Sequence, residues 1–509
     1  MKTLKTLLSS FFIVHCSLLI VHCSLAQSPV WIDFSQRKLA YPDAEYFTGF
    51  GIAKVNKNET MEEKLKTAES YARQGLSESV KVTVQSTAVH QVEEKDRKIA
   101  DDYKQSVASF SNVSLSGLKN ETWFDKKSKT AYAFAWVNKQ ELADIFQNQM
   151  NLHTSQLESK LKEANQLFSS GQKQKALDIY NTCFPLVRQM EEDLVMLVTI
   201  GKSLGGKLPG DYESQISAAI SGIQQNTNLN LDELCQLLAG RLNAQLGKFT
   251  QTIRMVPFTY QDSKMASELS ARFLSLFEQK LTDQGLSVSS MAGQNAGNSI
   301  LLSGTYWEEG DYLKFIAVVK NPDNGKTLAS AENRIPKSWM LANNLAFKPE
   351  NFEDAMQRMK VMTKDELIGG GLLLNVWTNK GDENLLFTDG EIMKLSVRVN
   401  HECYLRFIYY FADGTKTLLD DNYYISNDQI NKVVTLPTDY KCYPPFGAET
   451  LQVVAQNEKF QPLQIKEEDG YKIILENTQA IVNTIRGFKK DSDQKLFAEK
   501  RLTITTIKK

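Results

Sequence analysis

Two glutamates in the C-terminal third of the chain could supply acid–base chemistry. Glu391 follows Gly390 and Glu449 follows Gly447-Ala448, and both glutamates lie in predicted strands. If these strands meet, one carboxyl group could act as a general acid and the other as a general base. Alternating strands more commonly place charged residues at turns and solvent-facing edges. The pair is a candidate dyad, and we favour the structural role.

Two short sequences, Gly201-Lys-Ser203 and Gly325-Lys-Thr327, resemble the end of a phosphate-binding loop. Such a loop needs a glycine five residues earlier, because its backbone amides wrap around the phosphates. Met196 and Lys320 occupy those places. Neither sequence indicates a nucleotide site, and the chain predicts no cofactor.

Three histidines follow the N-terminal segment, and His90, His153 and His401 stand in separate regions. A zinc site or a catalytic triad would need them to converge from far apart in sequence. The zinc-protease motif His-Glu-x-x-His is absent. The sequence therefore predicts no metal site and no catalytic residues, and a protein that is not an enzyme.

Four of the six cysteines lie beyond the N-terminal segment, and they fall into two sequence-local pairs, Cys183 with Cys235 and Cys403 with Cys442. None belongs to a Cys-x-x-Cys motif of the kind that holds zinc. An oxidising compartment would permit two disulfides, and buried free thiols are the equal alternative.

Aromatic residues are dense near the C-terminus, and Tyr409, Phe411, Tyr423 and Tyr424 are candidates for a binding face. Aromatic side chains on one face of a sheet can bind a peptide or glycan. Strand alternation implies that about half of them belong to the core instead. Both interpretations stay open at this point.

The first 26 residues have the pattern of a cleavable signal peptide. Lys2 and Lys5 precede an apolar run, and the segment ends in Ser24-Leu-Ala26. His and Cys residues inside the run make it a poor membrane-spanning helix. No small residues precede Cys16 or Cys23, so a lipid attachment site is absent. We expect an exported protein, in the periplasm or at the outer membrane, without a transmembrane span after cleavage.

The charges are nearly balanced, with 59 Lys and Arg against 60 Asp and Glu. Removal of Lys2 and Lys5 with the signal leaves a net charge of -3. Nucleic-acid-binding proteins carry a basic excess, so no nucleic-acid partner is expected.

The length of 509 residues predicts several units, and the first, residues 27–150, is predicted to be an α+β unit. The apolar stripe Met61, Leu65, Ala68, Ala72 and Leu76 predicts a helix. The period of two in Val80, Val82 and Val84 then predicts a strand. Two more strands are expected around the turn Asp125-Lys-Lys-Ser128.

This unit resembles the LPP-type small surface lipoproteins. The resemblance rests on the opening Pro29-Val-Trp31, on Tyr46-Phe-Thr-Gly-Phe-Gly-Ile-Ala53, and on the closing Tyr132-Ala-Phe-Ala-Trp-Val137. The resemblance implies an envelope protein, because members of that family are envelope proteins and some of them take part in surface assembly. The sequence departs from that family in lacking the lipid-attachment cysteine.

Residues 151–247 are predicted to form a helical spacer. Leu161, Ala164, Phe168, Gly171 and Tyr180 resemble one tetratricopeptide helix pair. No second copy follows at that repeat's period. The stretch Gly201 to Gly210 should break the helices.

Residues 248–345 predict an α/β unit of strand, helix and three-stranded meander. Ile253-Arg-Met-Val-Pro-Phe258 and Ile300-Leu-Leu-Ser-Gly304 resemble envelope-assembly domains of flagellar outer-membrane accessory proteins and curli secretion factors. That resemblance implies a domain that binds proteins and has no active site.

A linker is expected over 346–365, and a β-sandwich over 366–509. Gly390-Glu391, Tyr404-Leu405, Asp413-Gly414 and the segment from Phe446 to Leu451 resemble a bacterial β-domain of unknown function. That domain accompanies peptidase, kinase and repeat modules, which implies an accessory role and carries over no catalytic residue.

Together these features predict a multidomain α+β protein: an N-terminal α+β domain, a helical spacer, a small α/β sandwich domain and a C-terminal β-sandwich. We predict a non-enzymatic cell-envelope protein that acts as a protein-binding, assembly or accessory scaffold, with envelope or outer-membrane proteins as partners. The alternative is a periplasmic glycan- or peptide-binding module, or an unrecognised hydrolase, centred on the C-terminal sandwich.

Overall fold

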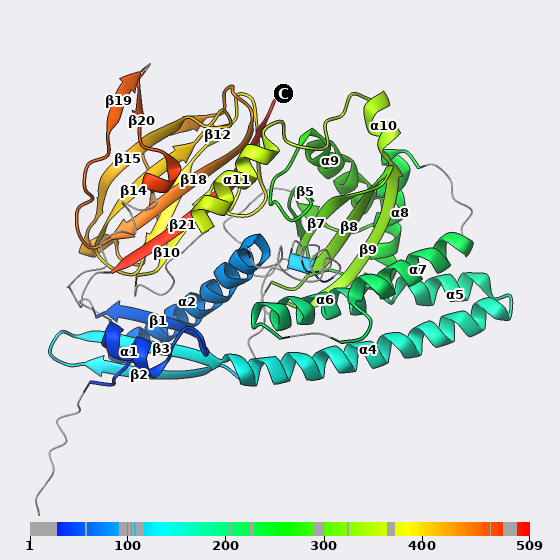
Figure 1. The fold of residues 1–509 in the computed structure, drawn as a ribbon, viewed down its shortest axis with the longest axis horizontal. Coiled ribbons are helices and arrows are strands. Elements are labelled where there is room, and N and C mark those ends of the chain that lie inside the picture. The colour runs from blue at the N-terminus through cyan, green and yellow to red at the C-terminus, as the bar shows by residue number, and fades with distance from the viewer. Residues whose placement is uncertain are drawn as a thin grey trace, which may run out of the picture.

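The computed structural model is described for most of the chain beyond the N-terminal segment. The described residues are 28–55, 59–90, 99, 103, 106–107, 117–202, 205–223, 229–289, 300–322, 325–363, 372–468, 470–481 and 496–509. The predicted signal peptide, residues 1–26, lies outside them. The predicted class, a multidomain α+β protein with sandwich-like sheets, is confirmed (Figure 1).

The N-terminal unit is a three-stranded antiparallel sheet with the long helix α2 on one face. The strand order is β1-β3-β2. Its elements are α1 (Phe34–Ala40), β1 (Tyr46–Lys54), α2 (Met61–His90), β2 (Lys119–Asp125) and β3 (Thr130–Asn138). An aromatic cluster around Trp31, Phe50 and Phe134 covers the other face.

The strand predicted at Val80, Val82 and Val84 is wrong, because α2 continues through it to His90. Val80 and Val84 are buried, one helical turn apart, and extend the stripe of Ala72 and Leu76. Val82 is only half-buried. Burial against the sheet at helical spacing outweighs the strand preference of valine.

Gly49 and Gly51 let α2 approach β1 closely. A Cβ added at Gly51 would lie 2.0 Å from the carbonyl oxygen of Ala68, and one at Gly49 would lie 2.0 Å from that of Ala72. These glycines therefore set the distance between helix and sheet, and do not merely shape a turn.

The helical region begins at Lys139, before the expected boundary at residue 151, and its last helix ends at Leu246. Its helices are α4 (Lys139–Ser169), α5 (Lys173–Asn181), α6 (Phe184–Thr199), α7 (Pro209–Ile223) and α8 (Leu231–Leu246). Helices α4 to α7 share one continuous core with α2 and its sheet. The boundary expected at 150 falls inside α4, so these helices are no independent spacer.

The α/β unit contains the predicted strand, helix and meander. Its elements are β4 (Ile253–Met255), β5 (Thr259–Tyr260), α9 (Glu268–Asp283), β6 (Val288–Ser289), β7 (Ile300–Glu309), β8 (Tyr312–Lys320), β9 (Thr327–Pro336) and α10 (Lys337–Ala342). The strand order is β6-β4-β7-β8-β9. Helix α8 lies beside α9 on this sheet, and its apolar residues belong to the core of the α/β unit. The boundary expected at residue 247 therefore falls between α8 and the sheet that α8 covers.

The expected linker contains a helix, α11 (Phe352–Thr363). The amide of Asn351 donates to the carbonyl oxygens of Ala412 and Ala448 at 2.7 and 2.9 Å, and Arg358 also donates to Ala448. The segment is thus packed on the last unit.

The last unit pairs a seven-stranded sheet with smaller sheets around a buried core. The order of the large sheet is β11-β21-β18-β14-β15-β20-β19. The elements of this unit are β10 (Leu374–Thr378), β11 (Leu385–Thr388), β12 (Ile392–Met393), β13 (Leu395–Val399), β14 (Cys403–Tyr410), β15 (Lys416–Ile425), η2 (Asn427–Gln429), β16 (Val434–Thr435), β17 (Tyr440–Lys441), β18 (Gly447–Gln456), β19 (Ile465–Glu468), β20 (Tyr471–Ile474) and β21 (Phe497–Ile507).

Candidate functional site

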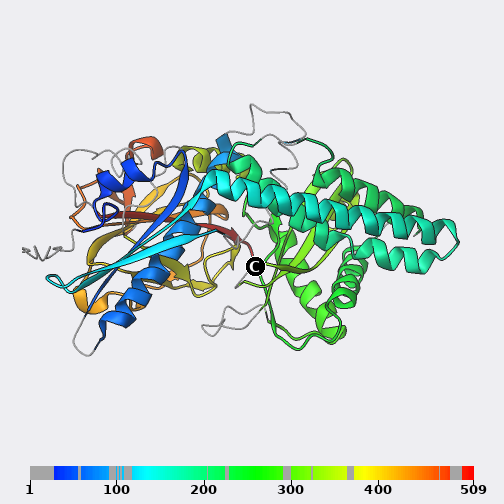
Figure 2. The same cartoon turned by 90° about the horizontal axis from the view of Figure 1, so that it is seen from below.

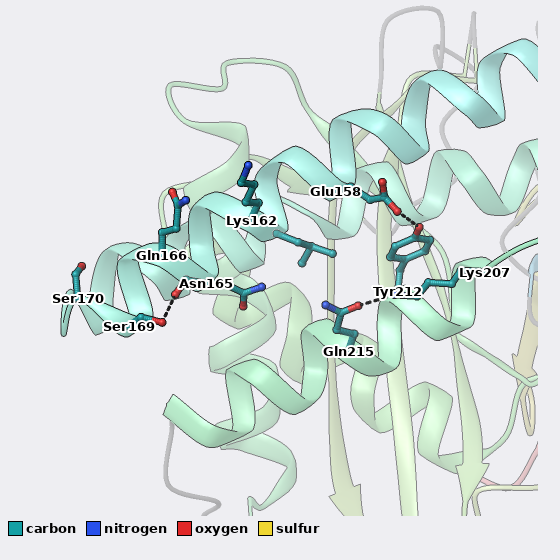
Figure 3. Close-up of a pocket in the computed structure, with 10 residues that line it drawn as sticks. Glu158, Lys162, Asn165, Gln166, Ser169, Ser170, Lys207, Tyr212 and Gln215 are labelled. Carbon is teal, nitrogen blue, oxygen red and sulfur yellow. Dashed lines mark hydrogen bonds between the residues drawn. The ribbon is translucent and has the colours of Figure 1, made fainter.

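An open groove of about 680 Å³ lies between α4 and α7 (Figure 3). One wall is a single face of α4, and the other comes from α7 and the residues just before it. The lining residues are Glu158, Leu161, Lys162, Asn165, Gln166, Ser169, Ser170, Lys207, Tyr212 and Gln215.

The amphipathic pattern of α4 decides which of its faces lines the groove. Leu157, Leu161 and Ala164 are buried in the shared core. Polar residues at spacings of three and four then project along the adjacent face. Asn138 caps the start of the helix, and its side-chain oxygen accepts hydrogen bonds from two backbone N–H groups of the first turn. Gly171, with φ of 79°, ends the turn that leads into α5.

Tyr212 joins the two walls. Its hydroxyl donates to a carboxylate oxygen of Glu158 at 2.7 Å, while its side chain is buried. Burial, together with the Glu158 carboxylate, raises the pKa of Tyr212 to about 12. Tyr212 therefore stays protonated at neutral pH and acts as a fixed hydrogen-bond donor. The ammonium of Lys207 lies 5.1 Å from the centre of its ring.

The rest of the lining offers hydrogen bonds of both kinds. Asn165 and Gln215 point into the space between α4 and α7 (Figure 3). Asn165 accepts a hydrogen bond from the hydroxyl of Tyr180 at 2.5 Å, which orients its amide. Side-chain amides can match the donors and acceptors of a peptide backbone. With the exposed ammonium groups of Lys162 and Lys207, this lining suits binding of an extended polar chain.

The four aromatic residues predicted as a binding face do not share one exposed face. Tyr409 is buried in the sandwich core, and Phe411 and Tyr423 are half-buried against that core. Only Tyr424 is exposed, at 49%, and its ring lies 5.1 Å from that of Tyr404. Strand alternation directs most of these rings inward, so the expected face is wrong.

The candidate dyad is divided between two separate sets of partners. Glu391 accepts from the ammonium of Lys380 at 2.6 Å and from the backbone of Thr388 at 2.8 Å. Glu449 accepts from the hydroxyl of Tyr409 at 2.7 Å. Burial raises the pKa of Glu449 to about 7. Burial also acts to raise the pKa of Glu391, but the hydrogen bonds from Lys380 and Thr388 and the charge of Lys380 together outweigh it, so the pKa of Glu391 is lowered. Each carboxyl group is thus held by its own partners, and this arrangement favours the structural role for both glutamates.

His153 and His401 have separate hydrogen-bonding partners. The Nδ1 atom of His153 lies 2.7 Å from a carboxylate oxygen of Asp193, whose pKa burial raises to about 6. The Nδ1 atom of His401 lies 2.9 Å from the backbone oxygen of Glu402. The side chain of His90 is outside the described residues. Among the described residues, no group of three or more His, Cys, Asp or Glu side chains could hold a metal ion.

The four cysteines are free thiols. Cys183 and Cys235 belong to different cores, because α6 packs with α4 whereas α8 packs with α9. Cys403 is buried in the sandwich core, and Cys442 is half-buried against it. The alternative of two disulfides is therefore wrong, and burial raises the pKa of each thiol to about 12.

A buried cluster of charges, which sequence analysis missed, fixes the groove helices to the α/β sheet. Arg188 on α6 bonds to Glu191, to Glu213 on α7 at 2.7 Å and to Glu332 on β9 at 2.8 Å. All four side chains are at most 5% exposed. The available signal was the presence of charged residues within the apolar helix from Phe184 to Thr199, since buried charges require partners.

No protein-family model matches the chain, and no curated protein matches it. Among solved structures, the chain is similar to the crystal structure of the secreted protein HP1454 from the human pathogen Helicobacter pylori. The identity is 13% and the TM-score 0.22, over 63% of this chain and 96% of that one. No helix among the described residues is long and apolar enough to cross a membrane.

Proposed function

We propose that this protein is exported and serves as a non-enzymatic, protein-binding scaffold of the cell envelope. In this proposal, the groove between α4 and α7 holds an extended segment of a partner protein. The observation that supports it most is the polar groove itself. Buried ion pairs between Arg188 and its carboxylate partners attach the helices of this region to the neighbouring sheet. The proposal of export rests on the signal-like segment of residues 1–26.

Contacts between the units support a scaffold role. Helix α2 reaches the sandwich through Gln74, which donates to Asn375 at 2.5 Å, and through Glu78, which pairs with Lys500 at 2.7 Å. The α/β unit reaches the same sandwich where the backbone of Ala266 donates to the hydroxyl of Thr505 at 2.9 Å. Several units joined in this way can present a groove in a defined position, which lowers the entropic cost of binding.

The lining supports a peptide-like ligand. Leu161 and Tyr212 are buried, so the accessible lining is mainly polar, and amides and ammonium groups at the walls can pair with backbone carbonyls and carboxylates. The groove is open to the surface, as a segment of a larger protein would require. Because Tyr212 keeps its proton and Glu158 is bound to it, the groove suits recognition more than proton transfer.

Site-specific photo-crosslinking in the producing cells tests this function. A photoreactive amino acid at Gln166, inside the groove, should give a discrete adduct in the envelope fraction. The same amino acid at Gln236, an exposed position on α8, is the matched control and should give no such adduct. Mass spectrometry of the adduct then identifies the partner.

A charge variant of the groove completes the test. Replacing Lys162 and Lys207 by glutamate should abolish the Gln166 adduct and leave the circular dichroism spectrum unchanged, because both side chains are exposed. Identical adducts from Gln166 and Gln236, or none from either together with a cytoplasmic location of the protein, would contradict the proposal.

A further inference from the structure

Strand β2 is an outer strand of the N-terminal sheet. In the order β1-β3-β2 it pairs along all seven residues with β3, and the described strands leave its other edge unpaired. The cyan hairpin of β2 and β3 lies along the lower margin of the molecule in Figure 1 and on the face nearest the viewer in Figure 2. An unpaired edge exposes backbone N–H and C=O groups that can pair with a further strand.

The β2 edge carries the charged residues Lys119, Glu121 and Asp125, but it lacks two other devices that usually block such pairing, proline and a bulge. The sequence from Lys119 to Asp125 has no proline, and its register with β3 is continuous, without a bulge. Trp123 and Phe124 are apolar and only half-buried there.

The edge strand β9 shows the contrast. The side-chain amide of Gln245 accepts from the backbone N–H of Ser330 at 3.0 Å and donates to its carbonyl oxygen at 2.8 Å. Arg241 donates to the next outward carbonyl, that of Glu332, at 2.6 Å. Side chains from α8 thus satisfy the edge of β9, as a neighbouring strand would.

The sequence of β2 is complementary to itself in antiparallel orientation. In the register that pairs all seven residues, the two-fold axis passes through Thr122. Lys119 of one copy then faces Asp125 of the other, twice, and Thr122 faces Thr122. A two-fold axis perpendicular to the sheet keeps paired side chains on the same face. Opposite-charge and Thr–Thr pairs across antiparallel strands are stabilising.

The remaining pairs in this register contain no like charges. Glu121 would face Trp123 of the other copy, and Asn120 would face Phe124. Glu121 is already held in place, because it accepts from the indole N–H of Trp31 at 2.7 Å. Lys119 is bound at 3.1 Å to Glu141, but both side chains are about half-exposed, so this pair is weak. Lys119 can therefore turn toward a partner strand.

We propose that β2 pairs with β2 of a second copy of this chain, giving a continuous six-stranded sheet in the order β1-β3-β2-β2-β3-β1. The partner is thus this same chain, recognised through backbone hydrogen bonds and two Lys119–Asp125 pairs. The proposal is independent of the groove and of its ligand.

Light scattering during size-exclusion chromatography, with sedimentation velocity over a concentration series, tests the pairing on the chain without its first 26 residues. The wild type should form a dimer. Lys119→Asp, which places two like-charged pairs across the interface, should weaken association at least about tenfold. Lys126→Asp makes the same charge change at an exposed turn position outside β2, and it should leave the dimer intact.

Two further variants keep the test decisive. Thr122→Pro removes a backbone N–H at the proposed axis and should yield monomers, since edge strands tolerate proline. Thr122→Cys should form a disulfide-linked dimer when copper phenanthroline and oxygen accept the two electrons and the thiol protons are released. Lys127→Cys, at the exposed turn, should not. A wild type that stays monomeric at about 100 µM, a concentration at which a dimer with a dissociation constant of about 1 µM would be largely associated, would overturn the proposal. Equal cross-linking of both cysteine variants would also overturn it.

Discussion

Arg188 on α6 and Glu332 on β9 are separated by 144 residues in sequence and joined by a hydrogen bond of 2.8 Å in the interior. Glu332 also accepts from the hydroxyl of Ser217 on α7 at 2.8 Å. Arg188 therefore connects two helices of the groove region to the outer strand of the α/β sheet. A guanidinium group suits this place because its planar fork serves several carboxylates at once.

Replacing Arg188 by methionine should destabilise the protein strongly. The change removes the guanidinium group that Glu191, Glu213 and Glu332 share, although Glu213 keeps its pair with Lys314. Loss of one partner from a buried ion pair costs about 3–5 kcal/mol of unfolding free energy. Urea denaturation followed by circular dichroism measures this loss.

The matched control is Arg73→Met on α2. Arg73 pairs with Glu69 at 2.8 Å, but its side chain is 51% exposed. Surface substitutions of this kind usually change the unfolding free energy by less than about 0.5 kcal/mol. Equal effects at Arg73 and Arg188 would show that the buried cluster does not stabilise the fold.

Glu449 should make stability fall as pH rises. Its pKa is raised from 4.5 to about 7, chiefly by burial, so the folded state binds a proton more tightly than the unfolded state does. The stabilisation is complete below pH 4.5 and is lost as pH rises through 7. Glu449→Gln removes this titration and can still accept from the hydroxyl of Tyr409. Between pH 4.5 and 8, the variant should gain up to about 3 kcal/mol relative to wild type.

Urea denaturation at several pH values measures this difference. Glu458→Gln, at an exposed position, is the control and should follow the wild-type profile. If the unfolding free energy of Glu449→Gln changes with pH as that of the wild type does, then the carboxyl group of Glu449 does not titrate as proposed.

Gly51→Ala should separate α2 from β1. The added Cβ would lie 2.0 Å from the carbonyl oxygen of Ala68, which is backbone and cannot move alone. Overpacking of this kind costs about 1–3 kcal/mol or more. Gly75→Ala, within α2, is the control because its Cβ would meet its nearest atom at 3.5 Å. Alanine favours helix, so that variant should be neutral or up to about 1 kcal/mol more stable in thermal or chemical denaturation.

Alanine substitutions in the second half of α2 distinguish helix from strand. Val80→Ala and Val84→Ala remove buried methyl groups and should each cost about 1–3 kcal/mol. Val82→Ala should cost clearly less, because Val82 is half-buried on another helical face. Equal losses at all three positions would instead match a strand with one buried face.

Several strands of the C-terminal sandwich could be predicted from sequence because β-branched and aromatic residues are dense in them and turn residues separate them. The segment Cys403 to Tyr410 is β14, and the turn at Asp413-Gly414 joins it to β15. Gly414 there has φ of 88°. These features are local, so neighbouring residues suffice to specify them.

The groove could not be predicted in the same way. Its walls come from α4 and α7, and residues such as Asn165 and Gln215 have no distinctive spacing in the sequence. The prediction of an aromatic binding face was wrong because strand periodicity shows which residues share a face of the sheet, but not which face is buried. That depends on which sheet packs against them.

By itself, the sequence determined the α+β class, the meander of the α/β unit and several strands of the sandwich, such as β14 and β18, since periodicity and turn residues act over short distances. Tertiary structure decided that Val80 to Val84 are helical, that α8 covers the α/β sheet and that Arg188 meets Glu332. It also decided that Cys183 and Cys235 stay apart. These outcomes depend on which apolar surfaces bury one another, a free energy shared by segments far apart in the chain and absent from any local pattern.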